Sequence, residues 1–351
     1  MPAITASAST GVAVSAGGSG AKRPIPLLAY YYIWYNASSW NRGKLDYPLI
    51  GRYSSDDDSV MRQQVALAKS AGISGFLVSW KNTPLLDRRL AKLRAVASAA
   101  GFNLGIVFEA RHFDGTPLPM TAVRSSFRYL AANVADDPVF NIFGRPLVAW
   151  SGTWEFRHDQ IAAITRSYGG RLFILGMEKE PAAYRRASSL FQGNAYYWSS
   201  VDPLRTPGYG AKLRAFSAVV HQGHGLWIAP AAPGFDARLV GGSRVIPRRN
   251  GQTLRLEMNA ALSSSPDAIG LISWNEYSEN IEVEPSRAYH GTALAVVAAI
   301  EHAKAPRIAD FDSSAPSGFH AGPSQFVIVG ALIALTAGSV VALARRRGRG
   351  P

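Results

Sequence analysis

Eight short apolar runs, separated by amphipathic segments, constrain the fold of this chain more than any other feature. The runs are continuous rather than alternating in polarity, which is typical of strands buried on both faces of a parallel sheet. The expected strands are Leu27–Trp34, Gly72–Trp80, Asn103–Ala110, Arg145–Ser151, Arg171–Glu178, Gly193–Ser199, Gly225–Ala231 and Ala268–Trp274. Eight strands, each followed by a helix, predict an α/β fold of the (β/α)8 TIM barrel type over residues 25–309.

Helical segments with clear boundary signals separate the expected strands. Apolar residues repeat at helical spacing after Asp57 and Asp58, either of which can cap the start, and Gly72 lies just past the end. The segments Asp87–Gly101 and Thr253–Ser264 show the same pattern. A doubly wound open sheet is the alternative fold. It is disfavoured because no glycine-rich phosphate loop of the GxGxxG or GxxxxGK(S/T) type follows any strand.

The segments that flank this body predict attachment to a membrane. Residues 326–344 form an apolar stretch without any charged residue, and this stretch is long enough for a helix that crosses a bilayer. A buried helix of a soluble protein is the alternative. A basic tail follows at residues 345–351, and a Ser/Pro/Gly-rich tether precedes at residues 310–325. Arginines directly after the span favour a cytoplasmic tail. We therefore expect a single-pass cell-membrane protein with its body outside the cytoplasm.

The remaining termini and the bulk composition limit other functions. Residues 1–24 resemble a flexible leader or the remnant of a signal segment, without a clear export signal. The chain has 37 Lys and Arg against 24 Asp and Glu, for a net charge of +13, but no basic run within the body, so we expect no nucleic-acid partner. The absence of cysteine excludes disulfides, thiolate nucleophiles and Cys-based metal sites.

Aromatic and acidic residues recur where the expected strands end. A TIM barrel places its working residues at the carboxyl ends of the strands. These positions hold Tyr31, Tyr32, Trp34, Trp80, Glu109, Trp150, Glu178, Trp198, Asn275 and Glu276. Aromatic rings offer flat apolar faces for sugar rings, and carboxylates accept hydrogen bonds from hydroxyl groups. The set predicts a carbohydrate-binding cleft with an oligosaccharide or polysaccharide as the partner.

An acidic motif, GLISWNEYSENIEVEP, closes the eighth expected strand. Two carboxylates that flank a glycosidic bond are the minimum equipment for its hydrolysis. Glu276 and Glu279 lie three positions apart, and their mutual repulsion is expected to separate their pKa values. Glu282 and Glu284 are expected to face solvent or to pair with Arg287. The alternative is that the whole motif is a solvated acidic loop.

Several motifs, in chain order over about residues 25–300, resemble glycoside hydrolase family 99, the endo-α-mannosidase family. The strand-eight signature of that family, Asn-Glu-Trp-His-Glu-Gly, corresponds here to Asn275-Glu276-Tyr277-Ser278-Glu279-Asn280. The other segments that are similar to the family are YYIWY at Tyr31–Tyr35, the stretch Gly51–Trp80, FEAR at Phe108–Arg111, APAAPGFD at Ala229–Asp236 and RRNGQTLRLEMNAAL at Arg248–Leu262.

This resemblance implies a retaining α-mannosidase in which the 2-hydroxyl of the sugar attacks the anomeric carbon and forms a 1,2-anhydro intermediate. Glu276 would be the base for that hydroxyl, and Glu279 would be the acid and then the base for water. No metal or cofactor is implied. The expected substrate-binding residues are Tyr31, Tyr32, Trp34, Trp80, Glu109, Tyr197, Trp198, Asn275 and Arg249.

Three departures from the family signature put the substrate in question. Tyr277, Ser278 and Asn280 replace the Trp, His and Gly of the family. The two glutamates are retained, so the acid and base are kept while the subsites differ. A non-hydrolytic glycan-binding or polysaccharide-assembly protein on the same barrel is the alternative function.

Overall fold

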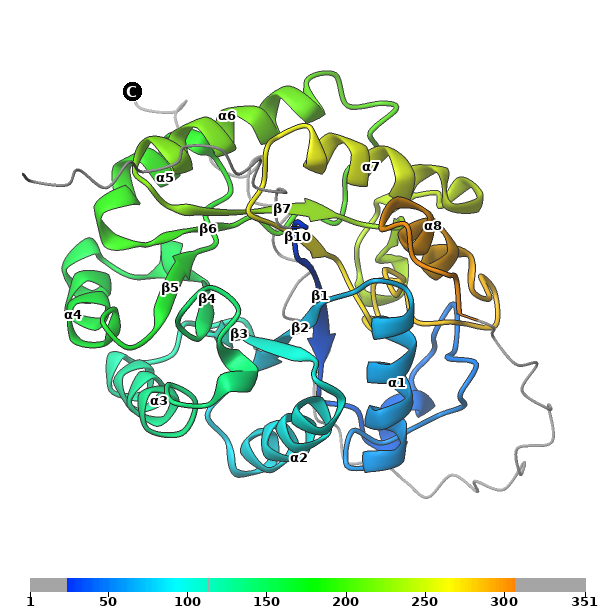
Figure 1. Cartoon of the computed structure of the whole chain (residues 1–351), viewed down its shortest axis with the longest axis horizontal. Helices are drawn as coiled ribbons and strands as arrows, with labels where there is room; N and C mark the ends of the chain where they lie inside the picture. The colour runs from blue at the N-terminus through cyan, green and yellow to red at the C-terminus, as the bar shows by residue number, and fades with distance from the viewer. Residues whose placement is uncertain (1–23, 113, 307–351) are drawn as a thin grey trace, which may run out of the picture.

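The computed structural model describes residues 24–112 and 114–306, and these form a closed barrel of eight parallel strands (Figure 1). The strands are β1 (Leu27–Tyr32), β2 (Gly75–Trp80), β3 (Asn103–Glu109), β4 (Leu147–Ser151), β5 (Phe173–Gly176), β6 (Gly193–Ala195), β7 (Leu226–Ala231) and β10 (Ala268–Leu271). Each lies within an apolar run of the sequence, so all eight expected strands are confirmed. The ring closes because β1 pairs with both β2 and β10, which rules out the open sheet.

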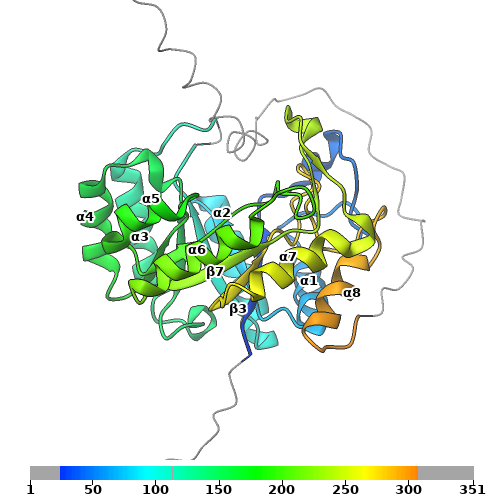
Figure 2. The same cartoon turned by 90° about the horizontal axis from the view of Figure 1, so that it is seen from above.

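Helices surround the barrel, and each barrel strand is followed by one (Figures 1 and 2). They are α1 (Asp58–Ser70), α2 (Pro84–Ala100), α3 (Met120–Asn133), α4 (His158–Tyr168), α5 (Pro181–Ala187), α6 (Tyr209–Gln222), α7 (Gln252–Leu262) and α8 (Thr292–Ile300). Short 3-10 turns lie at Ala37–Asn41, Pro138–Phe140, Thr153–Glu155, Ser188–Leu190, Arg238–Val240 and Arg249–Gly251.

The helix boundaries follow from their caps. The Asp57 side chain accepts the backbone N–H of Ser59, as the capping prediction for the first helix requires. Thr83 caps α2, which starts at Pro84, three residues before the expected start at Asp87. Proline suits this first helical position because its missing N–H has no partner there. Gly101 ends α2 with a left-handed backbone, which glycine adopts at little cost.

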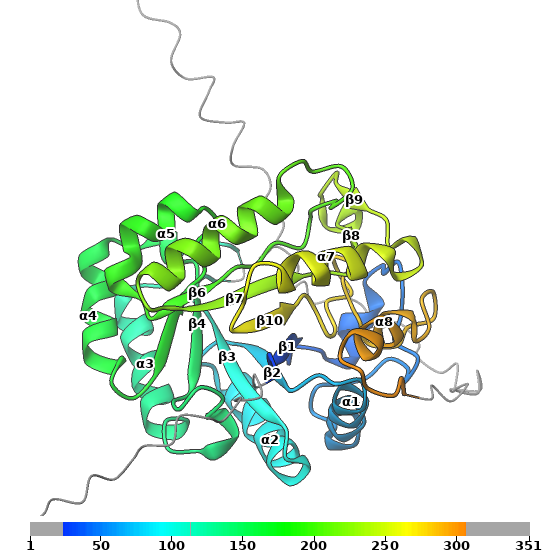
Figure 3. The same cartoon turned by 45° about the horizontal axis from the view of Figure 1, so that its top comes forward.

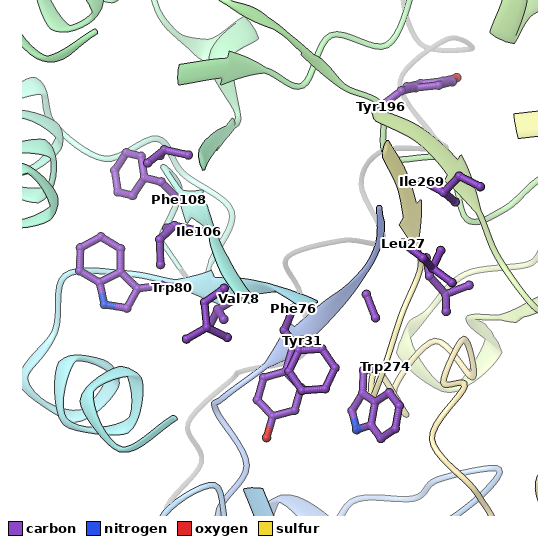
Figure 4. Packing of buried hydrophobic residues seen from close by; sticks show 14 of the residues in the cluster. Leu27, Tyr31, Phe76, Val78, Trp80, Ile106, Phe108, Tyr196, Ile269 and Trp274 are labelled. Atoms are coloured by element: carbon purple, nitrogen blue, oxygen red, sulfur yellow. The ribbon is translucent and has the colours of Figure 1, made fainter. Parts of the chain in front are cut away.

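Two apolar layers lie on opposite faces of the barrel strands. One fills the interior and includes Leu28, Tyr30, Leu77 and Val107. The other lies between strands and helices, and Figure 4 shows its side chains pointing outward from the ring. Successive residues in a strand point to opposite faces, so Tyr30 and Tyr31 belong to different layers.

A small antiparallel pair interrupts the barrel pattern after β7. Its strands are β8 (Phe235–Asp236) and β9 (Val245–Ile246), and Figure 3 shows the pair outside the ring of barrel strands. The backbone N–H of Asp236 donates to the carbonyl oxygen of Glu279 at 2.8 Å. This insertion therefore supports the segment that follows β10.

The flanking predictions fall outside the part of the chain that the structure describes. These are the leader at residues 1–24, of which only residue 24 is described, the tether at 310–325, the apolar span at 326–344 and the basic tail at 345–351. Within residues 24–112 and 114–306, every helix is too short or too polar to cross a membrane.

Candidate active site

A small hollow, with a cavity volume of about 60 Å³, opens at the carboxyl ends of the barrel strands. Its walls come from the inward-facing layer and from the loops above it. The lining residues are Tyr30, Tyr32, Ser79, Val107, Glu109, Arg111, Ser151, Trp154, Met177, Lys179 and Tyr197. Its position at the carboxyl ends of the strands is where TIM barrels carry their sites.

Glu109 ends β3 and supplies a carboxylate to this hollow. The hydroxyl of Ser79, on the neighbouring strand β2, donates to Glu109 Oε1 at 2.9 Å. Burial raises the pKa of Glu109, while the Ser79 hydrogen bond and the charge of Lys81 oppose that shift. The environment thus holds Glu109 as a hydrogen-bond acceptor in the wall.

Two tyrosines connect the hollow to the end of β10. The hydroxyl groups of Tyr32 and Tyr197 lie 3.0 Å apart, and both residues line the hollow. The ring of Trp34 packs on that of Tyr32, with centroids 4.4 Å apart. Burial raises the pKa of Tyr197, and the negative charges of Glu279 and Glu276 raise it further.

Glu276 and Glu279 are both buried, with 3% of each residue exposed. The backbone N–H of Ser278 donates to Glu276 Oε1 at 2.8 Å, while Ser273 Oγ accepts the N–H of Glu276 itself. Glu279 Oε2 is buried and has no hydrogen-bond partner among the described residues. The two carboxylates therefore differ in their surroundings, and the alternative of a solvated acidic loop is wrong.

These surroundings separate the proton affinities of the pair. Burial raises the pKa of Glu276, but hydrogen bonds from Ser278 and the charge of Lys44 oppose the rise. Burial raises the pKa of Glu279 well above its usual range, and the negative charge of Glu276 raises it further. When one proton is shared between the two groups, it resides on Glu279.

The prediction that Glu282 and Glu284 face solvent or pair with Arg287 is wrong. Both are buried. Glu282 forms an ion pair at 2.6 Å with Arg248, a residue of the segment before α7. Glu284 accepts hydrogen bonds from Gln64 at 2.6 Å and from Tyr53 at 3.0 Å. The partners come from parts of the chain that are distant in sequence, so local charge patterning did not reveal them.

Asn280 replaces the glycine of the family signature without a conformational conflict. Its backbone is left-handed, with φ of 52°. Asparagine tolerates this region better than most non-glycine residues. Arg248 donates to the Asn280 carbonyl oxygen at 2.9 Å and so holds this turn.

Four of the residues expected to bind substrate lie at or beside the hollow. Tyr32, Glu109 and Tyr197 line it, and Trp34 packs on Tyr32.

The other expected binding residues do not reach the hollow. Tyr31 and Trp80 belong to the outward layer, where Tyr31 donates to Gln64 and Trp80 donates to Asp87 of α2 at 2.9 Å (Figure 4). Trp198 packs on Tyr209 of α6, with ring centroids 5.5 Å apart. Arg249 forms an ion pair with Asp202 at 2.8 Å, away from the hollow.

Asn275 is buried and has a positioning role. Its side chain accepts the backbone N–H of Tyr32 at 2.8 Å and donates to the Tyr32 carbonyl oxygen at 3.0 Å. These two bonds join the end of β1 to the segment that carries Glu276 and Glu279.

Several lining residues were missed by the sequence analysis. They are Tyr30, Ser79, Val107, Arg111, Ser151, Trp154, Met177 and Lys179. Ser79 and Ser151 are neighbours of the tryptophans at the strand ends, so the alternation of faces along a strand was the signal that could have identified them. Arg111, Trp154 and Lys179 lie in loops just beyond β3, β4 and β5.

The described residues hold no group of three His, Asp or Glu side chains that could bind a metal ion. The polar groups of the hollow are one carboxylate, several hydroxyls and two cations, which suit a hydroxyl-rich organic ligand. Proton transfer and hydrogen bonding are the chemistry that this arrangement provides.

Neither a protein-family model nor a curated protein sequence matches the chain. Solved structures do match its fold. The GH99 endo-alpha-mannosidase from Bacteroides thetaiotaomicron has a TM-score of 0.68 at 18% sequence identity, over 78% of this chain and 95% of the other. A glycoside hydrolase-like protein has a TM-score of 0.61 at 16% identity, over 79% and 96% of the two chains.

A more distant match is the exo-beta-1,4-mannosidase from Opitutaceae bacterium strain TAV5, with a TM-score of 0.52 at 9% identity, over 79% of this chain and 60% of the other. The chain is therefore a TIM barrel whose fold resembles that of the GH99 endo-α-mannosidase. At these identities the likeness shows the fold, and it confirms the resemblance expected from the sequence at that level.

Proposed function

We propose that the chain is a retaining glycoside hydrolase that cleaves α-mannoside-like linkages in a glycan or polysaccharide. The observation that carries the proposal is the pair of buried carboxylates, Glu276 and Glu279, directly after β10. Their pKa values are raised to different extents, and their charges raise the pKa of Tyr197 in the wall of the hollow. Two carboxyl groups whose environments separate their proton affinities are suited to act as a base and an acid.

In the first step, Glu276 as a carboxylate accepts the proton of the sugar 2-hydroxyl while that oxygen forms a bond to the anomeric carbon. Glu279 as a carboxylic acid donates its proton to the glycosidic oxygen as the bond between that oxygen and the anomeric carbon breaks. The product is a 1,2-anhydro sugar. The larger rise in the pKa of Glu279 supports its assignment as the acid.

In the second step, Glu279 as a carboxylate accepts a proton from water, whose oxygen attacks the anomeric carbon. The bond between that carbon and the 2-oxygen breaks, and Glu276 returns its proton to that oxygen. Two inversions at one carbon give net retention. Both glutamates end the cycle in the protonation state in which they began, so no cofactor is required.

One observation favours a non-hydrolytic glycan-binding alternative. The residues that line the hollow include Glu109 but neither Glu276 nor Glu279, and both of these are almost completely buried. A glycan-binding protein without hydrolytic activity, which binds its ligand at Glu109, Tyr32 and Tyr197, would have a hollow lined by the same residues.

The experiment that separates the two functions uses the full-length chain with α-mannan oligosaccharides. We expect new reducing ends, released first with the α configuration in an NMR time course. A matched substrate that lacks the 2-hydroxyl on the reacting sugar should not be cleaved. Retention of the oligosaccharide without any new reducing ends would favour the binding protein, and equal cleavage of the 2-deoxy substrate would refute the anhydro route.

A further inference from the structure

Two cationic side chains in the wall of the hollow have no part in the proposed mechanism. Arg111 lies just after β3, and Lys179 lies just after β5. Trp154, in the loop after β4, lies in the wall with them and is 40% exposed. A neutral sugar needs hydrogen-bond partners and an aromatic platform but no pair of cations, so these residues point to an additional feature of the ligand.

Arg111 is held in a defined position. Its Nε donates to the carbonyl oxygen of Gly115 at 2.7 Å, and Nη2 lies 3.5 Å from Glu155 Oε1. Its side chain is 16% exposed. A guanidinium that is fixed in this way is pre-organised for an oxyanion, because its donors lie in one plane and lose little freedom on binding.

Lys179 and Trp154 form one unit in the same wall. Lys179 Nζ lies 4.0 Å from the centroid of the Trp154 ring. Among the ion pairs of residues 24–112 and 114–306, none includes Lys179. The Trp154 Nε1 donates to Glu155 Oε1 at 3.1 Å, so this carboxylate already has both Arg111 and Trp154 as partners.

The two cations act on one another. Burial lowers the pKa of Lys179, and the positive charge of Arg111 lowers it further, while Glu155 and Glu178 oppose that effect. The Glu178 carboxylate accepts the hydroxyl of Thr153 at 2.8 Å. Since both cations line the same hollow, an anion bound there would reduce their repulsion.

We propose that this hollow binds a glycan residue that carries an anionic group, a uronate carboxylate or a sulfate or phosphate ester, against Arg111 and Lys179. The sugar ring of that residue packs on Trp154. The inference rests on the proposed function, since that function supplies the glycan, and it predicts a preference for acidic over neutral polysaccharides.

The test measures binding rather than turnover, with the full-length chain. Dissociation constants are determined by ligand-observed NMR for methyl α-D-mannoside and for its uronate, 6-sulfate and 6-phosphate counterparts. We expect at least one anionic glycoside to bind about tenfold more tightly than the neutral one, because hydrogen bonds to charged groups are stronger. The selectivity ratio is the dissociation constant of the neutral glycoside divided by that of the anionic one. The anionic glycoside with the highest ratio identifies the anionic group.

Variants locate the effect. Lys179→Met keeps the apolar contact with Trp154 and should lower the ratio of the two dissociation constants to near one, while Lys179→Arg should restore it. Arg111→Gln should also lower the ratio. Because Arg111 holds Gly115, this variant can disturb its loop, and Lys179→Met then carries the test. Arg205→Gln removes one exposed charge beside Asp202, outside the hollow, and is the matched control.

A ratio near one in the wild type, the absence of binding by any glycoside, or a ratio that survives Lys179→Met would overturn the proposal. A ratio that only Arg205→Gln abolishes would do the same. Glu279→Gln should retain the preference for the anionic glycoside while losing hydrolysis, so the test of the anionic subsite is independent of the test of the proposed hydrolase. Selective binding without hydrolysis in the wild type rejects the proposed hydrolase alone, whereas hydrolysis of neutral mannan without selectivity rejects the anionic subsite alone.

Discussion

At the scale of single residues, the difference between Glu276 and Glu279 is the basis of the proposed chemistry. Glu276 Oε1 accepts a hydrogen bond from the backbone N–H of Ser278 at 2.8 Å, and the positive charge of Lys44 lowers the pKa of Glu276. Glu279 Oε2 has no hydrogen-bond partner among the described residues, and the negative charge of Glu276 raises the pKa of Glu279. Hydrogen bonds and a cation stabilise the ionised form of Glu276, whereas burial and like charge stabilise the protonated form of Glu279.

This difference predicts a bell-shaped dependence of kcat/KM on pH. Activity rises as pH passes the raised pKa of Glu276, because the base must be ionised, and falls as pH passes the higher pKa of Glu279, because the acid must be protonated. Lys44→Met should shift the acidic limb to higher pH, since Lys44 lowers the pKa of Glu276. Lys69→Met, on α1, should not shift it. An unchanged acidic limb in Lys44→Met would contradict the role of Glu276.

At the scale of elements, the segment after β10 is clamped from several directions. Asn275 joins it to the end of β1, Glu284 joins it to Gln64 of α1, and Glu282 joins it to Arg248. Each clamp uses a buried polar group, and each such group is costly unless it is hydrogen-bonded. The segment is thereby held rigidly, which suits a site whose carboxylates must keep their separation.

The Glu284 clamp predicts a specific dependence of stability on pH. Burial raises the pKa of Glu284 to about 7, compared with 4.5 for the exposed group. The folded state therefore binds this proton more tightly than the unfolded state does, and the associated stability is complete below pH 4.5 and lost as pH rises through 7. Glu284→Gln should remove that change.

The effect is measured as the difference in free energy of unfolding between wild type and Glu284→Gln in urea at pH 5 and at pH 8. Between pH 5 and pH 8 the wild type should lose at most about 3 kcal/mol of its free energy of unfolding relative to the variant. Glu180→Gln, at the exposed pair with Lys212, is the control. A difference that is the same at both pH values would show that Glu284 does not titrate as proposed.

The elements also show where sequence analysis succeeds and where it stops. All eight strands lie within the apolar runs, because buried parallel strands are apolar on both faces. The same property conceals which face of a strand is inside. Trp80 and Ser79 are adjacent at the end of β2, and only the barrel register reveals that Ser79 lines the hollow while Trp80 packs on α2.

The prediction for Glu282 and Glu284 failed for a different physical reason. Position after an apolar run predicts Glu276 and Glu279 as site residues, whereas Glu282 and Glu284 are buried with polar partners, Arg248, Tyr53 and Gln64, from distant parts of the chain. Contacts over such sequence distances depend on how the barrel closes, which local charge patterning does not encode.

At the scale of the whole molecule, a closed barrel carries the hollow at the carboxyl ends of its strands, as enzymes of this architecture do. The sequence adds a proposal on how the barrel is presented. The apolar span at residues 326–344 and the basic tail after it, both outside the described residues, suggest a membrane anchor with the barrel outside the cytoplasm.

This proposal predicts the partitioning of the expressed chain. The full-length chain should sediment with membranes and resist extraction by carbonate, and deletion of residues 326–351 should release it into the soluble fraction. Protease added to intact cells should remove the barrel by cleavage between residues 310 and 325. Cleavage only after lysis would contradict the orientation, and a soluble full-length chain would contradict the anchor.

The central claim is that Glu276 and Glu279 act together as base and acid at the mouth of the barrel. The most direct measurement compares the rate at which wild type and Glu279→Gln release reducing ends from an α-mannan oligosaccharide, together with their dissociation constants for it. The account predicts a loss of rate of about 10²–10⁴-fold in Glu279→Gln, with affinity largely retained, because a general acid contributes that much to catalysis. A variant that cleaves as fast as the wild type would contradict it.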